Sequence, residues 1–434
     1  MVIKEKITET YTTVERAKII VLSTFGSFLE WYDFFIAAVA ASLVWQFIYF
    51  NVFPQLSATF SIAAFGVSYF TRPIGAYLFG HLGDKKGRKY TLILTLVTVG
   101  VAMLGISVLP PASSIGLLAP ILLFVFRAVQ GIGFGGEFGG AASWVLESNS
   151  HSKWRGTFTS LTNAALGLGG GTAAALLFYL SSVVPRSSFL DFWWRVPFII
   201  GVIFLFSAAL IRYFALESNL FMKLEKEGKV LKSPANFAIR KEIGLMLLVA
   251  LAWLYAWWIN PTLIQIFAPF YLSKFGISST YVTYTIMVTN FVIVATMTLG
   301  GLLSDLIGRK KTVIISAILS AAFIYPYTLL LASHNLFNIL IAQVVIYSLA
   351  TLGSGSLTVY YTELFKTQYR YSASGLSYQF VALYAGILIT FGVPYILSSA
   401  NPLLYVILIG IILSVATIVI ISRMKETKDL NISE

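Results

Sequence analysis

The sequence predicts an all-α membrane protein with twelve transmembrane helices in two six-helix, pseudo-symmetric bundles. Three observations lead to this fold class. Of the 434 residues, 58% are hydrophobic and only 11% are charged, whereas a soluble domain carries about 25% charged residues. Long apolar stretches recur along the whole chain, and about 20 such residues cross a bilayer as a helix. An internal repeat then divides the stretches into two sets of six.

The apolar stretches are too long for transmembrane strands and show no strict alternation, which argues against a β-barrel. The polar segment before the first stretch does not resemble a cleavable signal peptide, so that stretch is expected to be a helix of the mature chain. Stretches longer than about 20 residues are expected to tilt or to project from the bilayer. The predicted spans are residues 18–49, 58–82, 90–109, 117–146, 157–182, 194–216, 243–273, 281–306, 312–333, 335–364, 371–397 and 402–423.

The basic residues predict the orientation of the chain, because loops rich in Lys and Arg stay in the cytoplasm. An even number of spans places both termini on one side of the membrane. Arg186, Arg195 and Lys274 fall on the opposite side, and Arg72 and Arg127 fall inside spans. The others lie on the side of the termini and include Lys4, Lys6, Lys85, Lys86, Lys153, Lys223, Lys226, Lys310, Lys311 and Lys366. Both termini are therefore predicted to be cytoplasmic in a multi-pass plasma-membrane protein, and the net charge of +12 to reflect topology and anionic lipid rather than nucleic acid.

The longest loop divides the chain into three parts. Residues 217–242 are charged and predicted to be cytoplasmic, between a first bundle at 1–216 and a second at 243–434. The segment from Glu217 to Gly228 is consistent with a short helix in a solvated linker.

The loops that follow the second and the eighth span share an unusual set of residues. Gly80, Leu82, Asp84, Gly87, Arg88, Lys89 and Thr91 recur at constant spacing as Gly301, Leu303, Asp305, Gly308, Arg309, Lys310 and Thr312. After the fourth and tenth spans, Glu147 and Arg155 similarly recur as Glu363 and Arg370. Two six-helix halves in parallel repeat are typical of one architecture of secondary transporters.

The repeated loop predicts a cytoplasmic gate. Its second glycine permits a tight turn, and its aspartate can pair with an arginine or face the N-terminus of a neighbouring helix. The arginine of each loop is expected to reach the glutamate that follows the fourth or tenth span, and such pairs would close one side of the protein in one state. The simpler alternative is a set of basic turns that only fix the topology. The predicted gate residues are Asp84, Arg88, Glu147, Asp305, Arg309 and Glu363.

With these motifs the chain resembles the major facilitator superfamily over nearly its full length. The first half is similar to the metabolite:proton symporter branch, which includes permeases for α-ketoglutarate, citrate, shikimate and proline/betaine. The resemblance implies twelve helices and transport by alternating access. The seventh span, with Trp257-Trp258-Ile-Asn260-Pro261, departs from that branch. The matching segments are Glu30-Trp31-Tyr32-Asp33-Phe34, Arg72-Pro73-Ile74-Gly75, Arg127-Ala-Val-Gln130-Gly131, Gly135-Gly136-Glu137-Phe138 and Trp194-Arg195-Val-Pro197-Phe198.

Five ionisable residues are predicted to lie at depth in the membrane: Glu30, Asp33, Arg72, Arg127 and Glu137. A lone charge there costs about 2.5 kcal/mol or more, so such residues normally pair and face a cavity. Depth is counted from the cytoplasmic end of each helix, at a rise of about 1.5 Å per residue. On this count Glu30, Arg72 and Glu137 lie near the middle of the membrane, and Asp33 and Arg127 lie further from the cytoplasm. The alternative role for these residues is a permanent salt-bridge cluster between the first, second and fourth spans.

This arrangement suits proton coupling. An apolar cavity favours the protonated form of a carboxylate, and a nearby arginine favours the ionised form. We expect Asp33 to be the main proton carrier, with Glu137, Glu30 and Arg127 completing the coupling set. A guanidinium that stays charged, as in Arg127 or Arg72, can hold a carboxylate of the solute in two hydrogen bonds.

The second half offers uncharged polar groups for the solute. Asn260 is the strongest of them, because Pro261 is expected to break its helix and free carbonyl groups. For each of these groups the alternative is a hydrogen bond between helices. Trp253, Trp257 and Trp258 are further candidates to line the cavity. The predicted solute contacts are Arg127, Arg72, Tyr32, Gln130, Asn260, Gln265, Asn290, Gln343 and Gln379.

The sequence therefore predicts a monomeric, proton-coupled symporter of an organic acid or zwitterion, with the small solute, protons and the bilayer as its partners. The main alternative is a carrier of a sugar or another neutral solute, by uniport or symport, followed by drug efflux. A membrane enzyme, a channel and a sensor lack supporting motifs. No cofactor or metal is expected, because the chain has no cysteine and its three histidines are far apart. The glycine runs 131–136 and 167–171 are attributed to close packing of the fourth and fifth spans.

Overall fold

The computed structural model describes residues 11–432, and Lys4 and Lys6 of the polar N-terminal segment lie outside the described residues. Helices account for most of that part of the chain, which contains no β-strand. The prediction of an all-α fold is therefore confirmed.

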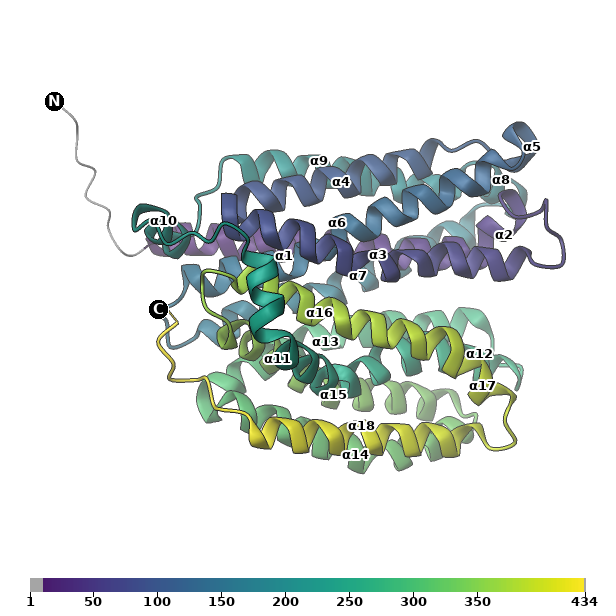
Figure 1. The fold of residues 1–434 in the computed structure, drawn as a ribbon. Coiled ribbons are helices and arrows are strands. Elements are labelled where there is room, and N and C mark those ends of the chain that lie inside the picture. The colour runs from purple at the N-terminus through teal and green to yellow at the C-terminus, as the bar shows by residue number, and fades with distance from the viewer. Residues whose placement is uncertain (1–10, 433–434) are drawn as a thin grey trace.

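The helices form two sets that lie side by side (Figure 1). The first set consists of α1 (Thr13–Ala40), η1 (Ala41–Trp45), α2 (Gln46–Ile48), α3 (Ser57–Lys86), α4 (Arg88–Val108), α5 (Ala112–Ile115), α6 (Leu118–Ser148), α7 (Arg155–Val183), α8 (Arg186–Asp191), η2 (Trp193–Arg195) and α9 (Val196–Tyr213). After α10 (Asn219–Lys226), the second set consists of α11 (Pro234–Trp257), η3 (Trp258–Phe267), α12 (Ala268–Ser273), α13 (Ser279–Ile307), α14 (Arg309–Ala332), α15 (Leu336–Leu364), α16 (Arg370–Ile387), η4 (Leu388–Gly392), α17 (Val393–Ser398) and α18 (Pro402–Arg423).

Among the described residues, ten helical stretches are long and apolar enough to cross a membrane. Two further segments lie beside these ten stretches and complete the twelve predicted spans. They are the helix α3 and the continuous run of α16, η4 and α17. Each predicted span therefore corresponds to one helix or to one run of consecutive helical segments.

Two helices begin well before the predicted start, the first and the seventh. The first starts at Thr13, because Thr12 and Glu15 form a reciprocal capping box at its N-terminus. The seventh starts at Pro234, a residue suited to the first turn of a helix because it has no N–H to leave unbonded. Residues 234–242 of the predicted linker thus belong to α11, whereas the predicted short helix is present as α10.

Three of the long helices widen locally into π-helical turns, η1, η3 and η4. The predicted break at Pro261 does not occur, because the chain continues through this residue as η3. A π-helical turn leaves some N–H and C=O groups out of the α-helical pattern, so it accommodates a residue without N–H. Such turns are frequent at functional sites, and η3 carries Asn260.

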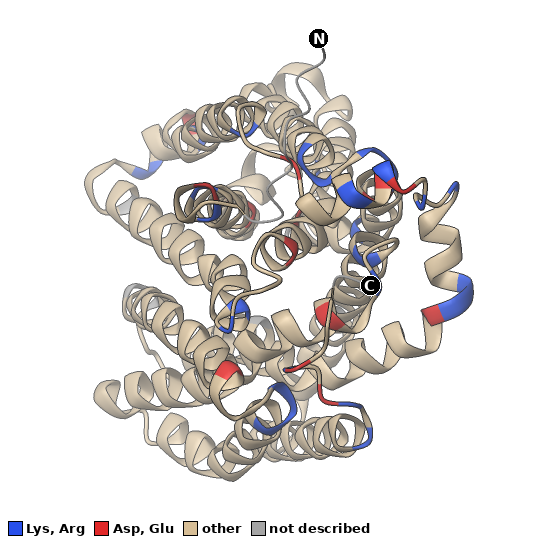
Figure 2. Ribbon diagram, turned by 90° about the vertical axis from the view of Figure 1, so that its left-hand side faces the viewer, with Lys and Arg blue, Asp and Glu red and all other residues tan. Residues whose placement is uncertain are grey.

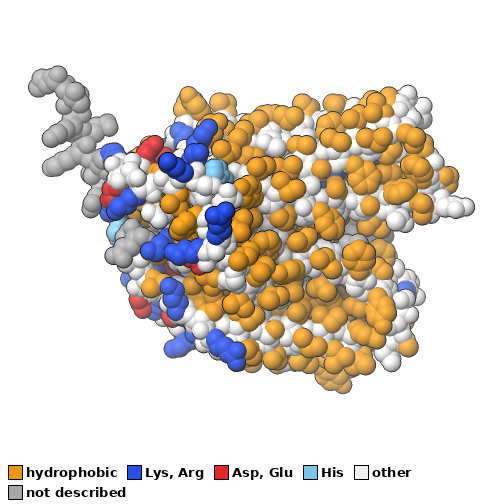
Figure 3. Space-filling view, viewed as in Figure 1, with side chains coloured by type: hydrophobic (Ala, Val, Ile, Leu, Met, Phe, Trp, Pro, Cys, Tyr) orange, Lys and Arg blue, Asp and Glu red, His pale blue; other side chains and the backbone are white. Residues whose placement is uncertain are grey.

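Both ends of the described chain lie at one end of the molecule, which we call the terminal face (Figure 1). Lysine and arginine side chains gather at this end, while hydrophobic side chains cover the middle of the visible surface (Figure 3). The view onto the terminal face shows the charged residues distributed over both sets of helices (Figure 2).

The two sets approach closely where α6 meets α16. A Cβ atom added to Gly139 of α6 would lie 2.5 Å from the Cα atom of Gly375 on α16, whereas the nearest atom to a Cβ on Gly375 would be 3.8 Å away. The glycines of α6 and α7 pack mainly against other helices rather than against each other: Gly135 faces the backbone of Arg72 in α3, and Gly169 faces that of Phe28 in α1.

We predict that Gly139→Ala disfavours this arrangement of the two sets by about 1–3 kcal/mol, because the methyl group has only backbone to displace. The matched variant Gly375→Ala should have little effect. Spin labels on the exposed residues Lys85 and Lys366, introduced through cysteines into a chain without native cysteine, measure the distance between the sets at the terminal face. A longer distance in both variants, or in neither, would contradict the prediction.

Candidate functional site

Four of the five ionisable residues predicted at depth form two separate buried pairs within the first set. Nη1 of Arg72 on α3 donates to the Glu30 carboxylate of α1 at 3.0 Å. One turn further along α1, the Asp33 carboxylate lies 3.5 Å from Nη1 of Arg127 on α6. Asp33 also accepts a hydrogen bond of 2.9 Å from the Gln130 side chain. All four ionisable side chains are at most 2% exposed.

The fifth residue, Glu137, does not join Glu30 and Arg72 as predicted. It pairs with Arg212 near the end of α9 at 2.6 Å, and it also accepts a hydrogen bond from Thr95. Arg212 lies one turn before the polar linker, so sequence reasoning placed it at the terminal side. Its side chain is fully buried and reaches inward because Glu137 and the carbonyl oxygens of Leu22 and Leu92 accept its hydrogen bonds.

We predict that Arg212→Leu lowers the free energy of unfolding by about 3–5 kcal/mol, because it leaves the Glu137 carboxylate buried without its partner. The double variant with Glu137→Leu should recover most of this loss, since replacing both members of a buried pair by apolar residues is often neutral. Thermal unfolding in detergent measures both. Equal destabilisation of the single and the double variant would show that the pair does not act as a unit.

The two guanidinium groups predicted to hold the solute are already occupied. Arg72 lies between Glu30 and the rings of Tyr69 and Phe134, each 5.5 Å from the guanidinium carbon. Arg127 donates to Gln130 and to Ser68 in addition to its contact with Asp33. Each positive charge is matched by a carboxylate, so neither guanidinium offers an unmatched charge in this state.

The other predicted solute contacts differ in how they are bonded. Tyr32 donates to the Pro197 carbonyl, and Asn290 donates to the Ile286 carbonyl on its own helix. Gln379 makes a long contact of 3.5 Å to the Gly135 carbonyl across the two sets. The Gln343 side chain is buried without a hydrogen-bond partner within the described residues. Asn260 accepts a hydrogen bond of 3.0 Å from Gln265.

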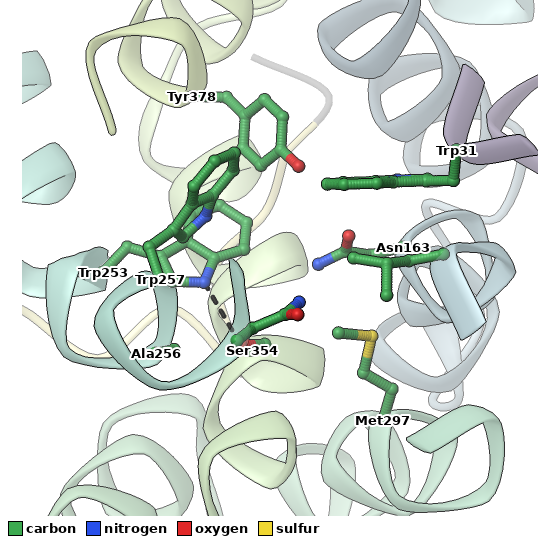
Figure 4. A pocket seen from close by; sticks show the side chains of 10 residues that line it. Trp31, Asn163, Trp253, Ala256, Trp257, Met297, Ser354 and Tyr378 are labelled. Carbon is green, nitrogen blue, oxygen red and sulfur yellow. Dashed lines mark hydrogen bonds between the residues drawn. The ribbon is translucent and has the colours of Figure 1, made fainter. Parts of the chain in front are cut away.

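A small cavity lies between the two sets (Figure 4). Its volume of about 10 Å³ holds about one water molecule, so a metabolite would need its walls to part. Of the predicted solute contacts, Asn260 alone lines it. The tryptophan candidates Trp253 and Trp257 also line it, and Trp258 does not. The lining residues are Trp31, Asn163, Leu166, Trp253, Ala256, Trp257, Asn260, Met297, Ser354 and Tyr378.

The walls of this cavity are aromatic and uncharged. Trp31 and Asn163 point into it from the first set, opposite Trp257 and Tyr378 of the second (Figure 4). The ring centres of Trp31 and Trp257 are 6.4 Å apart. Asn163 donates to Thr358 of α15 at 3.1 Å, while its carbonyl oxygen has no hydrogen-bond partner within the described residues. Sequence reasoning did not select Asn163, although it is the one amide in an apolar, Gly- and Ala-rich span.

At the terminal face, the predicted gate residues of the first set meet the second set. Arg88 lies 3.1 Å from Glu147, as expected from the repeat, and Glu147 is also 3.1 Å from Arg370 of α16. The Asp84 carboxylate accepts hydrogen bonds from the N–H groups of Tyr371 and Ser372 at the N-terminus of α16. A carboxylate is stabilised in this position by the exposed N–H groups of the helix.

The second set repeats this arrangement. Arg309 lies 3.0 Å from Glu363, which is also 2.6 Å from Arg155 of α7. The Asp305 carboxylate accepts hydrogen bonds from the N–H groups of Gly156 and Thr157 at the N-terminus of α7. Each set thus contributes an aspartate and a glutamate to contacts with the other set, and all six predicted gate residues lie in these two networks.

The turn before Arg88 and the turn before Arg309 have the same conformation. Gly87 and Gly308 have φ angles of 107° and 108°, a region that favours glycine. Each following arginine donates its N–H to a glutamate that sequence reasoning missed, Glu217 or Glu426. Burial raises the pKa of Glu217, while hydrogen bonds from backbone N–H groups oppose this shift. A sequence pattern that could have indicated these two glutamates is the Glu-Ser or Glu-Thr pair that follows the last long helix of each set.

The chain is similar to known membrane transport proteins. Residues 23–355 match the family model of the Major Facilitator Superfamily. The inner membrane metabolite transport protein YhjE of Escherichia coli is 32% identical over 383 residues, which cover 86% of each chain. The shikimate transporter of the same organism is 28% identical over 389 residues, again 86% of each chain. A structure of the proton:xylose symporter XylE superposes with a TM-score of 0.81, at 16% identity and with coverage of 98% of this chain and 99% of the other. That last likeness concerns the fold alone.

Proposed function

The chain belongs to the Major Facilitator Superfamily, and from this premise we propose that it is a proton-coupled symporter of an organic acid or zwitterion. Members of this family that resemble it are metabolite transporters, so the chain is a multi-pass membrane transporter of metabolites and not an enzyme. The coupling to protons and the class of solute are the proposal.

The observation that carries the proposal is the environment of Asp33. This carboxyl is buried in the middle of the first set, beside one guanidinium and one amide. Its contact with Arg127 is 3.5 Å, longer than the 3.0 Å between Arg72 and Glu30. When Asp33 takes up a proton, Arg127 loses its counter-charge and becomes available to a carboxylate of the solute. The proton thus neutralises Asp33, and the carboxylate of the solute neutralises Arg127. Binding of the proton therefore favours binding of the solute.

The two networks at the terminal face support alternating access. We place the terminal face in the cytoplasm, because the basic residues gather there. The bundles 1–216 and 243–434 would rock about the linker 217–242. Opening toward the cytoplasm then requires Asp84 and Asp305 to leave the helix N-termini of the opposite set. The six gate residues therefore close the cytoplasmic side in the state seen here and separate in the other.

A second candidate is a carrier of a neutral solute such as a sugar. It is favoured by the cavity between the sets, whose lining residues include indole and phenol rings, amides and a hydroxyl but no charged side chain. Aromatic faces and amides suit a hydroxylated, uncharged solute as well as a zwitterion.

Exchange of labelled solutes across liposomes distinguishes these candidates, because exchange needs solute binding but no proton gradient. We expect exchange with an organic acid or zwitterion, lost in Trp257→Ala and retained in the matched variant Trp258→Ala, since Trp257 lines the cavity and Trp258 does not. Exchange with sugars alone would favour the second candidate. Equal effects of the two variants would mean that the cavity does not bind the solute.

A further inference from the structure

The segment that follows α18 returns across the terminal face and enters the interface between the two sets. Arg155 of the first set donates to the carbonyl oxygens of Thr427 and Lys428 at 3.1 and 3.0 Å. Arg370 of the second set donates to the carbonyl oxygen of Ile432 at 2.9 Å. The segment is therefore held by arginines from both sets.

The side chain of Ile432 adds an apolar contact to these hydrogen bonds. It is 4% exposed and packs with Leu146 of α6 and Val359 of α15, both of which are fully buried. Leu430 packs against the same cluster. An isoleucine thus occupies the seam between one helix of the first set and one of the second, at the end of a mostly polar segment.

The same two arginines make the ion pairs that join the sets. Arg370 contacts Glu147 at 3.1 Å and Arg155 contacts Glu363 at 2.6 Å, and each arginine donates from its Nη2 atom to the segment. Separation of the sets at this face must therefore also detach the segment from at least one of them. The segment therefore increases the free energy needed to open the terminal face, in addition to the contribution of the gate residues.

Among the described residues, the first set has no segment inserted into the interface in this way. Glu217 and Ser218 repeat the contacts of Glu426 and Thr427, since both glutamates accept the N–H of an arginine and both hydroxyls donate to a gate glutamate. After Ser218, however, the chain forms α10 rather than entering the interface. The inserted segment is thus an asymmetric addition to the repeat.

We propose that residues 427–432 form a strap that locks the terminal face closed and so sets the balance between the two access states. Withdrawal of the strap permits opening, and its return stabilises the closed face. Loss of the buried isoleucine contact should shift the population of the open state by roughly tenfold.

The strap is tested by the accessibility of a cysteine buried at the interface. Ser143 of α6 lies 3.4 Å from Ser374 of α16, hydroxyl to hydroxyl, so Ser143→Cys reacts with a membrane-impermeant maleimide when the terminal face opens. The chain has no native cysteine. The test variants are Ile432→Asp and a chain that stops after Asp429. The matched control is Asp429→Ala, which changes an exposed residue of the same segment.

We expect labelling of Ser143→Cys to be about tenfold faster in Ile432→Asp and in the shortened chain, and unchanged in Asp429→Ala. Ala102→Cys, buried inside the first set, should stay unlabelled in every background, which separates opening from unfolding. Labelling at the control rate in both test variants would overturn the proposal, as would equal acceleration at Ala102→Cys. Since the assay needs neither solute nor protons, its result is independent of the proposed symport.

Discussion

Asp33→Asn is expected to lower solute-driven proton uptake at least tenfold while leaving the protein folded. The amide keeps the shape of the side chain and a partner for Gln130, but it cannot exchange a proton near neutral pH. Arg127 then lacks the counter-charge of Asp33 whether or not a proton is available, because its contact with Asp33 is its one ion pair among the described residues. Solute and proton movement should therefore become uncoupled.

The matched variant is Glu30→Gln, which removes the other paired carboxylate of α1. Its ion pair with Arg72 is shorter, so we assign it mainly to holding α1 against α3 and expect a smaller loss of coupling. Internal pH and labelled-solute uptake are measured in the same liposomes. Proton uptake that persists in Asp33→Asn would show that another group carries the proton.

Asp84→Arg is expected to reduce transport at least tenfold without preventing insertion into the membrane. The substitution removes the acceptor for two N–H groups at the start of α16 and places a second guanidinium beside Arg88. Hydrogen bonds that involve a charged group are worth about 1.5–3 kcal/mol each, so the closed terminal face loses much of its stability. The protein should then accumulate in the state that is open at this face.

The control for this variant is Glu227→Arg, which reverses a charge on an exposed linker residue. Initial rates of uptake, normalised to the amount of protein in the membrane, compare the two. Transport at the full rate by Asp84→Arg would mean that the repeated loop serves topology alone.

The repeat was sufficient to predict much of this architecture. Twelve apolar stretches correspond to the twelve helical spans, and the loop motif correctly pairs Arg88 with Glu147 and Arg309 with Glu363. These predictions succeed because apolar length and repeated spacing are local properties of the sequence.

Contacts between distant helices were not predictable in the same way. The partner of Glu137 is Arg212, which sequence reasoning assigned to the polar end of the sixth span. Depth along a helix does not determine which neighbour a side chain faces. The cavity illustrates the same limit, because Trp31 and Tyr378 meet only when the two sets pack. The break expected at Pro261 was wrong, because a wider helical turn accommodates the residue.

Solute-induced proton uptake tests the central claim most directly. The purified protein is placed in liposomes that contain a pH-sensitive dye and is challenged in turn with dicarboxylates, tricarboxylates, shikimate, betaine, amino acids and sugars. The account predicts internal acidification with one organic acid or zwitterion, and loss of this signal in Asp33→Asn. Flux of labelled solute without any change in internal pH would contradict it, and would make Asp33 a structural partner of Arg127 in a uniporter.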